Sequence, residues 1–305
     1  MTNAPELFVR HDGRAGARNH VLVLPSVICA ARVATAVADA IGAVGITHQH
    51  GCSQVGDDAI QTAGAFEEIA CHPNVGGTLV VSLGCETVQG RELAARVEAR
   101  GQTVRFVGIQ EAGGSQEAVE EGRRAGLHLV DAVEGARRES VPIPRLVVGV
   151  ERSRPSALAE AFVEHALAAG ATIVRGHAGA DGSPPARAVA AFSGPRAAEL
   201  LGGVVVSNAG HGPQQHVALA AVGAQVIVSF PGDRSPPLGF SICPVVTVGG
   251  DSPLHRALAG DFDADESVGA KGLWELVLAV AGGEPCAAER RGSREFVLER
   301  LARAM

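Results

Sequence analysis

The sequence predicts an α/β protein with two doubly wound, mostly parallel sheet domains and flanking helices. Three observations predict this class. Short apolar runs recur along the chain, alanine-rich segments of helical spacing separate them, and 39 glycines in 305 residues supply many turns. Strands of a parallel sheet are covered by helices on both faces, so they appear in a sequence as unbroken apolar runs. The hydrophobic content of 46% excludes fibrous and disordered classes.

Four apolar runs in the first half are expected to be strands, at residues 20–25, 42–48, 77–84 and 103–110. The segments between and after them are expected to be helices, at residues 29–41, 56–70, 89–100 and 115–127. Strands that alternate with helices of this length form βαβ units, so the first half should contain one parallel sheet.

The stretch "GARRESVPIPRLVVGVE" starts as a charged, proline-bearing linker and ends in a new apolar run. It places the domain boundary between residues 1–142 and 143–305. The second half is expected to contain strands at 145–150, 171–175, 203–207, 224–229 and 242–248, helices at 155–169 and 214–221, and two helices within 266–304. The Gly/Pro-rich stretch 175–189 is expected to be a mobile loop or lid.

Charge and composition narrow the partners. There are 33 acidic and 26 basic groups, and the basic groups are scattered, so we expect no nucleic-acid partner. No apolar run reaches the roughly 18 residues that a membrane helix needs, and the N-terminus lacks the pattern of a signal peptide. These features favour a cytoplasmic protein with no membrane partner. Six cysteines are then expected to be core thiols or ligands rather than disulfides.

Unusual polar residues follow the predicted strands. In chain order they are Ser26 and Cys29, then His48, His50 and Cys52, then Cys85 and Glu86, then Gln110 and Glu111, and in the second half Asn208, His211, Asp233 and Arg234. In an open parallel sheet, ligands bind outside the carboxyl ends of the strands. We therefore expect a site at this edge.

The stretch "ITHQHGCSQVGDD" raises the question of a metal. His48 and His50 point the same way if the strand continues, and Cys52 follows in a turn, so a soft N/S ligand set is available. The alternative is that His48 caps the strand and Cys52 is a small buried hydrophobe. The pattern lacks the second spaced pair of a zinc signature.

The other candidates also have plain alternatives. Glu86 in "LGCE" is a candidate ligand or general base, or it caps the helix that starts near Gln89. Gln110 precedes a glycine-rich turn and can be merely solvated. His211 and His216, in "SNAGHGPQQH", can be surface residues, although the glycines beside His211 would let backbone approach a ligand.

Several stretches together resemble the large catalytic region of the altronate/galactarate dehydratase family. They are "RHDGRAGARNHVLVLPSVICA", "THQHGCSQ", "HPNVGGTLVVSLGCE", "IQEAGGS", "GAQVIVSFPGDRSPPLGFSICPVV" and "AGGEPCAAERRGSREF". The family also includes the large subunit of (R)-sulfolactate sulfo-lyase. The resemblance implies a metal-dependent lyase that eliminates water or sulfite from an α-hydroxy carboxylate. The implied metal is a divalent ion, iron first, with zinc or manganese as alternatives.

The resemblance also implies partners. Family members have a small N-terminal domain of the SAF type, which is sometimes a separate chain. No such domain precedes "RHDGR" here, so we expect a separate small SAF-type subunit or none. The other expected partner is a small-molecule carboxylate substrate, and we expect a homo-oligomer.

This chain departs from the family after the strand at 145–150. Family members carry a Cys-Gly-Gly-Ser-Asp segment, a Glu-Thr-Pro-Glu stretch and a lysine-bearing loop in this region. Here the chain reads "RSRPSALAEAFVEHALAAGATIVRGHAGADG". The loss favours a smaller substrate. It also leaves open a noncatalytic or degenerate paralogue that acts as a subunit of a lyase complex.

These arguments assign roles to named residues. The metal ligands are expected to be His48, His50, Cys52 and Cys85. The catalytic residues are expected to be Glu86, His50 and His211. Substrate binding is assigned to Arg18, Gln110, Asn208 and Arg234, because an arginine can hold a carboxylate with two hydrogen bonds.

Overall fold

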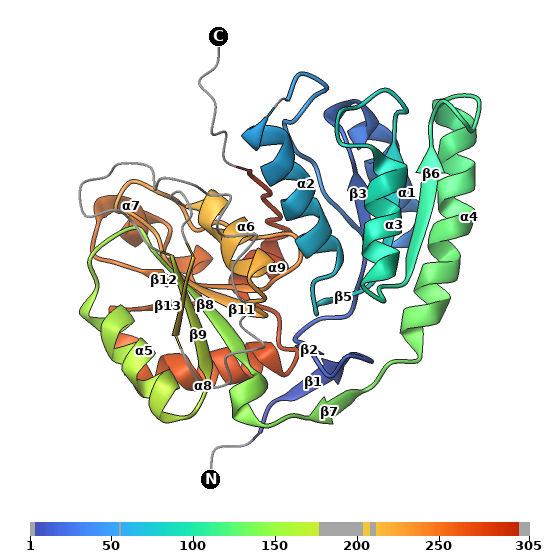
Figure 1. The fold of residues 1–305 in the computed structure, drawn as a ribbon. Helices are drawn as coiled ribbons and strands as arrows, with labels where there is room; N and C mark the ends of the chain where they lie inside the picture. The colour runs from blue at the N-terminus through green and yellow to red at the C-terminus, as the bar shows by residue number, and fades with distance from the viewer. Residues whose placement is uncertain (1–3, 55, 177–203, 208–211, 299–305) are drawn as a thin grey trace. The chain divides into compact units, whose positions relative to one another are not determined.

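The computed structural model describes residues 4–54, 56–176, 204–207 and 212–298 (Figure 1). The contacts within the chain define two compact units. The four-stranded unit consists of Asn19–Arg137 and the chain from Phe296 onward. The six-stranded unit consists of the chain up to Arg18 together with Arg138–Glu295. A single boundary at residues 142/143 therefore does not describe this division, because the N-terminal strands belong with the second half of the chain.

The four-stranded unit has one parallel sheet in the order β4-β3-β5-β6. Its strands are β3 (His20–Pro25), β4 (Val44–Gly45), β5 (Val75–Ser82) and β6 (Val104–Gly108). Its helices are α1 (Ala31–Ile41), α2 (Asp57–Ala70), α3 (Gly90–Ala99) and α4 (Ser115–Glu134). The long crossovers between parallel strands are those of βαβ units.

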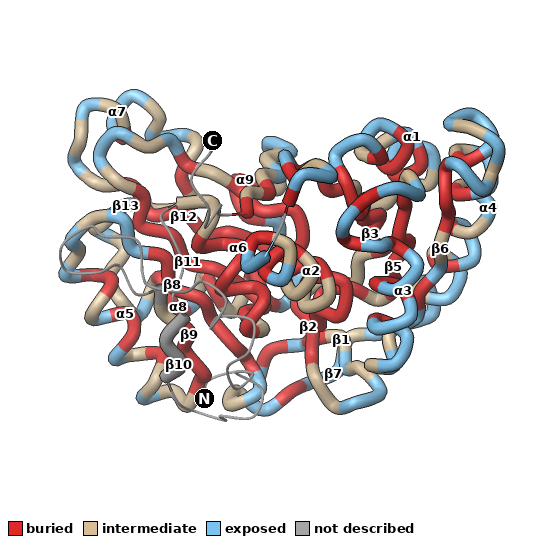
Figure 2. The backbone as a smooth tube through the Cα atoms, turned by 45° about the horizontal axis from the view of Figure 1, so that its top comes forward, coloured by how far each residue is buried: buried red, intermediate tan, exposed pale blue. Residues whose placement is uncertain are grey.

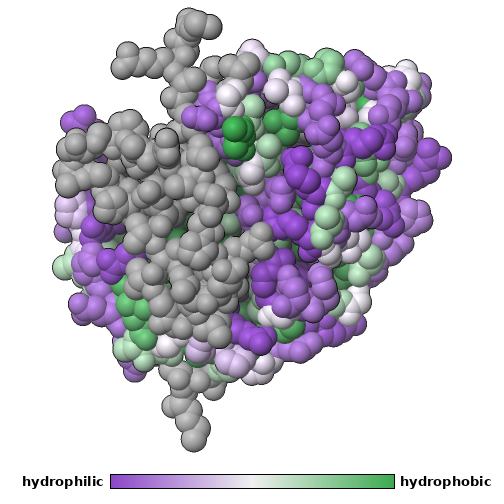
Figure 3. All heavy atoms as spheres, in the orientation of Figure 1, coloured by the Kyte–Doolittle hydropathy of each residue, from purple (hydrophilic) through white to green (hydrophobic). Residues whose placement is uncertain are grey.

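Helices cover both faces of this sheet. Alternate strand residues such as Val23 and Val81 are buried in one cluster with α1 and α4, because successive side chains of a strand point to opposite faces. Helices α2 and α3 contact each other and pack against β5. Gly126 lets α1 approach α4, since a Cβ there would lie 2.4 Å from Ile41 Cδ1. The face of this unit in view in Figure 3 is mainly hydrophilic, with apolar residues in small groups.

The six-stranded unit has a parallel sheet in the order β10-β9-β8-β11-β12-β13. Its strands are β8 (Val147–Arg152), β9 (Thr172–Gly176), β10 (Val204–Ser207), β11 (Val226–Phe230), β12 (Val245–Gly249) and β13 (Ala264–Asp265). Its helices are α5 (Ala157–Ala168), α6 (Pro213–Ala221), α7 (Pro253–Ala257), α8 (Gly269–Ala281) and α9 (Ala287–Arg291). Strands β8, β11 and β12 are buried along most of their length (Figure 2).

One core cluster of the six-stranded unit joins its sheet to α5 and α8. Phe162 of α5 and Trp274 of α8 are buried there with Val148 and Val228 of the central strands. Helix α6 contacts the same sheet through β8 and β9. The unit therefore buries its strands as a doubly wound sheet does, and the predicted α/β class is confirmed.

A small antiparallel sheet was not predicted. It has the order β2-β1-β7, from β1 (Glu6–Val9), β2 (Ala15–Gly16) and β7 (Arg138–Ser140). The sequence hides it because β2 has two residues and β7 reads "RES", so neither forms an apolar run. The stretch predicted to be a linker thus contains a strand.

One further predicted strand is longer than the observed one. The strand predicted at 42–48 pairs only as Val44–Gly45, so residues 46–50 carry no strand. The predicted loop 175–189 lies almost entirely outside the described residues. Among the described residues, no helix is both long and apolar enough to cross a membrane.

Candidate functional site

Three turns at the carboxyl edge of the four-stranded sheet form the candidate site. The first turn (residues 26–30) follows β3, the second (46–54) follows β4, and the third (83–89) follows β5. A hydrogen bond joins each pair of turns: Ile28 N donates to His50 O (2.8 Å), Thr87 Oγ1 donates to Cys52 O (2.7 Å), and Ser26 Oγ donates to Glu86 Oε1 (2.7 Å). The three turns are therefore held together as one structure.

Each of the three turns carries one exposed cysteine: Cys29 on the first, Cys52 on the second and Cys85 on the third. A hydrogen bond joins the Cys52 and Cys85 side chains. Desolvation raises the pKa of the Cys52 thiol, and the neighbouring Cys85, Cys29 and Glu86 raise it further. The remaining cysteines of the chain are all buried, and they are Cys71, Cys243 and Cys286. The exposed thiols are thus gathered, and we call them the thiol trio.

His48 does not present a free nitrogen to a metal. Its Nε2 lies 2.9 Å from Pro25 O, which can only accept, and its Nδ1 lies 3.2 Å from the His50 backbone N, which can only donate. The ring must therefore be neutral, with its proton on Nε2. Burial lowers the pKa of His48 to about 4, against the hydrogen bond to Pro25, which raises it. The prediction of His48 as a metal ligand is corrected, because both of its nitrogens are used.

His50 is buried beside His48, with ring centroids 5.9 Å apart and planes 28° apart. Its Nδ1 lies 2.6 Å from Gln54 Nε2, and that amide also donates to Thr62 Oγ1 of α2 at 2.9 Å. An amide NH₂ can only donate, so it places the imidazole proton of a neutral His50 on Nε2. The ring orientation of His50 is therefore fixed by its neighbours.

Glu86 is buried, and both carboxylate oxygens accept hydrogen bonds. Oε1 accepts from Ser26 Oγ and Oε2 accepts from Gly84 N, each at 2.7 Å. Burial raises the pKa of this carboxyl, but the hydrogen bonds from Ser26 and from backbone N–H groups outweigh it, and the net shift is downward. A carboxylate held ionised in this way is a weak base. The structure therefore favours Glu86 as a positioning group over a general base.

Gln110 follows β6 and is exposed. Its side chain rests on Gly84 in the third turn, where a Cβ would lie 2.5 Å from Gln110 Oε1. Gly84 also has φ of +119°, which L side chains rarely adopt. This glycine gives the third turn its shape and brings Gln110 beside it.

The four predicted ligands do not fit a single metal ion. His48 has no nitrogen to offer. Among the described residues, no group of three or more His, Cys, Asp or Glu side chains is placed so that it could hold one metal ion. The set of His48, His50, Cys52 and Cys85 is therefore not a preformed mononuclear site.

Arg18 has a structural role in the six-stranded unit. Its guanidinium forms a two-point ion pair with Glu289, with Nε–Oε1 and Nη2–Oε2 both at 2.7 Å. The other N–H groups donate to the carbonyl oxygens of Ala17, Val280 and Glu284. All five donors are used, so the prediction that Arg18 binds substrate is corrected.

The remaining substrate-binding predictions have different outcomes. Arg234 is exposed in the loop after β11, and no described residue bonds to its guanidinium. It stays a prediction as a carboxylate ligand. Asn208 and His211 lie outside the described residues. His216 is buried at 2% exposure, not at the surface, and burial lowers its pKa to about 4.

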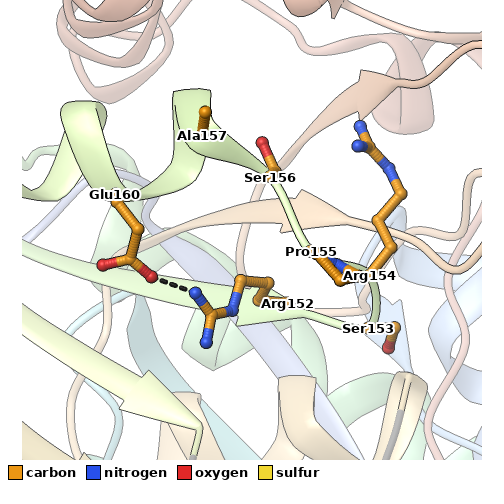
Figure 4. Close-up of a pocket in the computed structure, with 7 residues that line it drawn as sticks. All are labelled: Arg152, Ser153, Arg154, Pro155, Ser156, Ala157 and Glu160. Carbon is orange, nitrogen blue, oxygen red and sulfur yellow. Dashed lines mark hydrogen bonds and ion pairs between the residues drawn. The ribbon is translucent and has the colours of Figure 1, made fainter.

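A cavity of about 480 Å³ opens at the carboxyl end of β8, in the six-stranded unit (Figure 4). Arg152, Arg154 and Ser156 line it together with Glu160. Arg152 pairs with Glu160, as the dashed line in Figure 4 marks. Arg154 Nη1 pairs with Glu266 Oε1 at 2.5 Å. Because both guanidinium groups are already paired with carboxylates, the cavity does not present a free positive charge to an anion.

The six-stranded unit has its own buried carboxylate at a strand end. Glu151 of β8 is 1% exposed. It accepts hydrogen bonds from Ser229 Oγ of β11 at 2.6 Å and from Ser153 Oγ. The arrangement is similar to that of Glu86 and Ser26.

No role was predicted for Cys29, although it lies four residues after Pro25 in a strand-end turn. It is the third cysteine at the same sheet edge, but "SVICA" contains no second ligand residue at a spacing typical of metal sites. Gln54, which fixes His50, belongs to no recognisable motif either. The roles of both residues follow only from the contacts between the turns.

Comparisons with known proteins agree with the motifs. A sequence model of the second domain of D-galactarate dehydratase/altronate hydrolase matches residues 8–134. A model of the C-terminal domain of D-galactarate/altronate dehydratase matches residues 175–304. The chain belongs to the galactarate/altronate dehydratase family. All three cysteines of the thiol trio lie in the part that matches the family's second domain.

Two curated family members show how far this sequence has diverged from its relatives. Altronate dehydratase of Bacillus subtilis (strain 168) is 31% identical over 156 residues, which are 47% of this chain and 31% of that protein. Altronate dehydratase of Escherichia coli (strain K12) is 30% identical over 161 residues, which are 48% of this chain and 31% of that protein. The matched part thus spans about a third of the length of these relatives.

The two family models leave residues 135–174 between them. This interval contains β7, β8, α5 and most of β9. It begins the region in which the sequence departs from the family motifs.

Proposed function

We propose that this chain is the catalytic part of a lyase that eliminates water, or a related leaving group, from a small α-hydroxy carboxylate. The observation that carries the proposal is the edge of the four-stranded sheet, where three tied turns hold thiols, an imidazole and a carboxylate. This edge lies in the part of the chain that matches the second domain of the dehydratase family.

His50 is the general-acid candidate at this edge, because its Nε2 carries the imidazole proton. Removal of a proton next to a carboxylate is difficult because the product is a dianion, so a hydrogen-bond donor held in one orientation lowers the barrier. Gln54 fixes the His50 ring through Nδ1. Glu86 holds the first and third turns in register through Ser26 and Gly84. A Lewis acid bound at this edge would polarise the carboxylate and the α-oxygen of the substrate.

We propose a smaller substrate than an aldarate. The relatives are named as altronate dehydratases, and the segments in which this chain departs from the family begin after β8. A short acid needs fewer hydroxyl contacts than a long sugar acid. Arg234 is the proposed carboxylate ligand, and a separate small SAF-type subunit is a proposed partner.

The test is an anaerobic assay of the full chain with ferrous iron, with and without a small SAF-type partner encoded nearby. Formation of 2-keto acid is followed from galactarate, altronate, shorter 2-hydroxy acids and 3-sulfo acids. We expect turnover of a short acid. Loss of one acid or base costs a factor of about 10²–10⁴, so galactarate turnover should lie at least that far below the rate of a full-length relative.

A matched pair of variants tests the role of His50. His50→Gln should lower kcat by a factor of about 10²–10⁴. His128→Gln is the control, because His128 is exposed on α4 of the same unit, and it should leave kcat unchanged. Rapid galactarate turnover would contradict the smaller substrate. Absence of turnover with every acid, in a folded protein with its partner, would favour the noncatalytic subunit.

A further inference from the structure

We infer that Cys29, Cys52 and Cys85 are the three protein ligands of an iron–sulfur cluster of the four-iron type, with the fourth iron left without a protein ligand. The cluster itself is tested without substrate. Its use in an elimination reaction rests on the proposed function.

The first step is geometric. The thiol trio comes from three separate turns, and each turn is tied to the other two by a hydrogen bond of 2.7–2.8 Å. Cys52 is hydrogen-bonded to Cys85, and Cys29 follows Ile28, whose backbone N donates to His50 O in the turn of Cys52. All three side chains are exposed, whereas the other cysteines are buried in the cores of the units. The fold therefore collects thiols at one edge and at no other described place.

The second step concerns the kind of metal group. Sulfur ligands of one tetrahedral ion lie about 2.3 Å from it, and so within about 4 Å of one another. No described group is placed to hold a single ion, and His48 has no nitrogen to complete such a set. In a four-iron cluster each thiolate binds a different iron, so the thiols need not converge on one ion. Three exposed thiols on three tied turns suit such a group.

The third step is electrostatic. The Glu86 carboxylate belongs to the same turn as Cys85 and is hydrogen-bonded to Ser26 of the turn that carries Cys29. Thiolates gathered beside a carboxylate repel one another unless a cation neutralises them. This environment favours metal ligation over nucleophilic or redox chemistry of a free thiol.

The number of ligands matters for the site. Four-iron clusters are commonly held by four cysteines, and this edge provides three. An iron without a protein ligand is an open position for an oxygen ligand, as in catalytic metal sites generally. The small hydroxy acid of the proposed function offers such oxygens.

The experiment is anaerobic reconstitution of the full chain with ferrous iron and sulfide, followed by removal of unbound ions. Bound iron, acid-labile sulfide and the visible absorption of the protein are then measured. We expect about four irons and about four sulfides per chain, with a broad absorption band that bleaches in air.

Variants distinguish this ligand set from the four ligands predicted from the sequence, which are His48, His50, Cys52 and Cys85. Cys29→Ser should lower bound iron and sulfide at least fivefold, and Cys52→Ser and Cys85→Ser should do the same. His48→Gln should retain both, because His48 is bonded to Pro25 and to the backbone of His50. Cys71→Ala is the control for loss of a cysteine, since Cys71 is buried in the same unit. Circular dichroism of each metal-free variant checks that it is folded.

Three results would overturn the inference. They are iron bound without sulfide, a Cys29→Ser protein that keeps its cluster while His48→Gln loses it, and a wild-type protein that binds no iron and forms a Cys52–Cys85 disulfide. If the cluster forms but no acid is turned over, the proposed function fails and the inference stands. If a short acid is turned over by metal-free protein, the proposed function stands and the role of the cluster in it fails.

Discussion

The two parallel sheets end in similar ways and differ in one respect. In the four-stranded unit, Glu86 is buried and accepts a hydrogen bond from Ser26 of the neighbouring strand end. In the six-stranded unit, Glu151 is buried and accepts a hydrogen bond from Ser229 of the neighbouring strand. Only the first of these edges carries exposed thiols, because both cysteines of the six-stranded unit are buried.

The difference separates residues that hold strand ends together from residues that are candidates for the chemistry. A serine-bound glutamate at a strand end occurs in both units, so it is a way of holding adjacent strand ends together. The thiol trio occurs in one unit, on the same three turns as His50. We therefore propose the thiols and His50, rather than Glu86, as the reactive groups of the four-stranded unit.

The largest predicted effect concerns a feature that the two units share. Each buries a histidine with a pKa of about 4, His48 in one and His216 in the other. An unfolded histidine has a pKa near 6.5, so between about pH 6.5 and 4 the unfolded chain binds more protons than the folded chain. The stabilisation is complete above about pH 6.5 and is lost as the pH falls to about 4, by about 3 kcal/mol per histidine.

Urea unfolding at a series of pH values measures this loss. His216→Gln should remove about half of the acid-side decrease, because the substituted side chain does not titrate. His128→Gln, at an exposed position, is the control and should leave the profile unchanged. An unfolding free energy that is constant from pH 6.5 to 4 would show that neither histidine is buried neutral.

The second effect separates the two arginines that the sequence assigned to the substrate. Arg18→Ala leaves Glu289 and three carbonyl oxygens without their donor, so the unfolding free energy should fall by about 3 kcal/mol. Arg234→Ala should change it by less than about 0.5 kcal/mol and should raise KM for the acid. If Arg18→Ala is as stable as the parent and raises KM, Arg18 binds substrate after all.

The third effect compares the two glutamates directly. Glu86→Gln and Glu151→Gln should each lower the unfolding free energy by about 2 kcal/mol, because charge-assisted hydrogen bonds to serine are weakened. Denaturant titration measures both. Glu86→Gln should also lower cluster content, since it loosens the third turn, whereas Glu151→Gln should not. Equal cluster loss in both variants would mean that the effect is one of general stability.

The smallest effect concerns the shape of the third turn. Gly84→Ala forces an alanine to adopt φ of +119° and displaces Gln110, so it should cost about 1–2 kcal/mol. Gly135→Ala is the matched control, because Gly135 has φ of −73° and a Cβ there would meet no atom within 4 Å. Thermal unfolding of the two variants gives the comparison, and equal stability would show that the turn relaxes freely.

The sequence predicted those structural features that produce a recognisable pattern of residues. Buried strands such as β5 and β11 were predicted because parallel strands are apolar on both faces. The antiparallel β2-β1-β7 sheet was missed because its strands are short and charged. The sequence placed Cys52 and Cys85 at one edge, since strand order and strand ends are readable. It could not show that both nitrogens of His48 are bonded, or that Arg18 pairs with Glu289, because those partners are found only in three dimensions.

The central claim is that the thiol trio acts as one metal-binding group. The most direct test is alkylation of the native protein under anaerobic conditions, read cysteine by cysteine by peptide mass spectrometry before and after reconstitution with iron and sulfide. We predict that Cys29, Cys52 and Cys85 are alkylated in the metal-free protein and are protected together after reconstitution, while Cys71, Cys243 and Cys286 react only after denaturation. Continued alkylation of Cys29 in the reconstituted protein, with Cys52 and Cys85 protected, would contradict the claim.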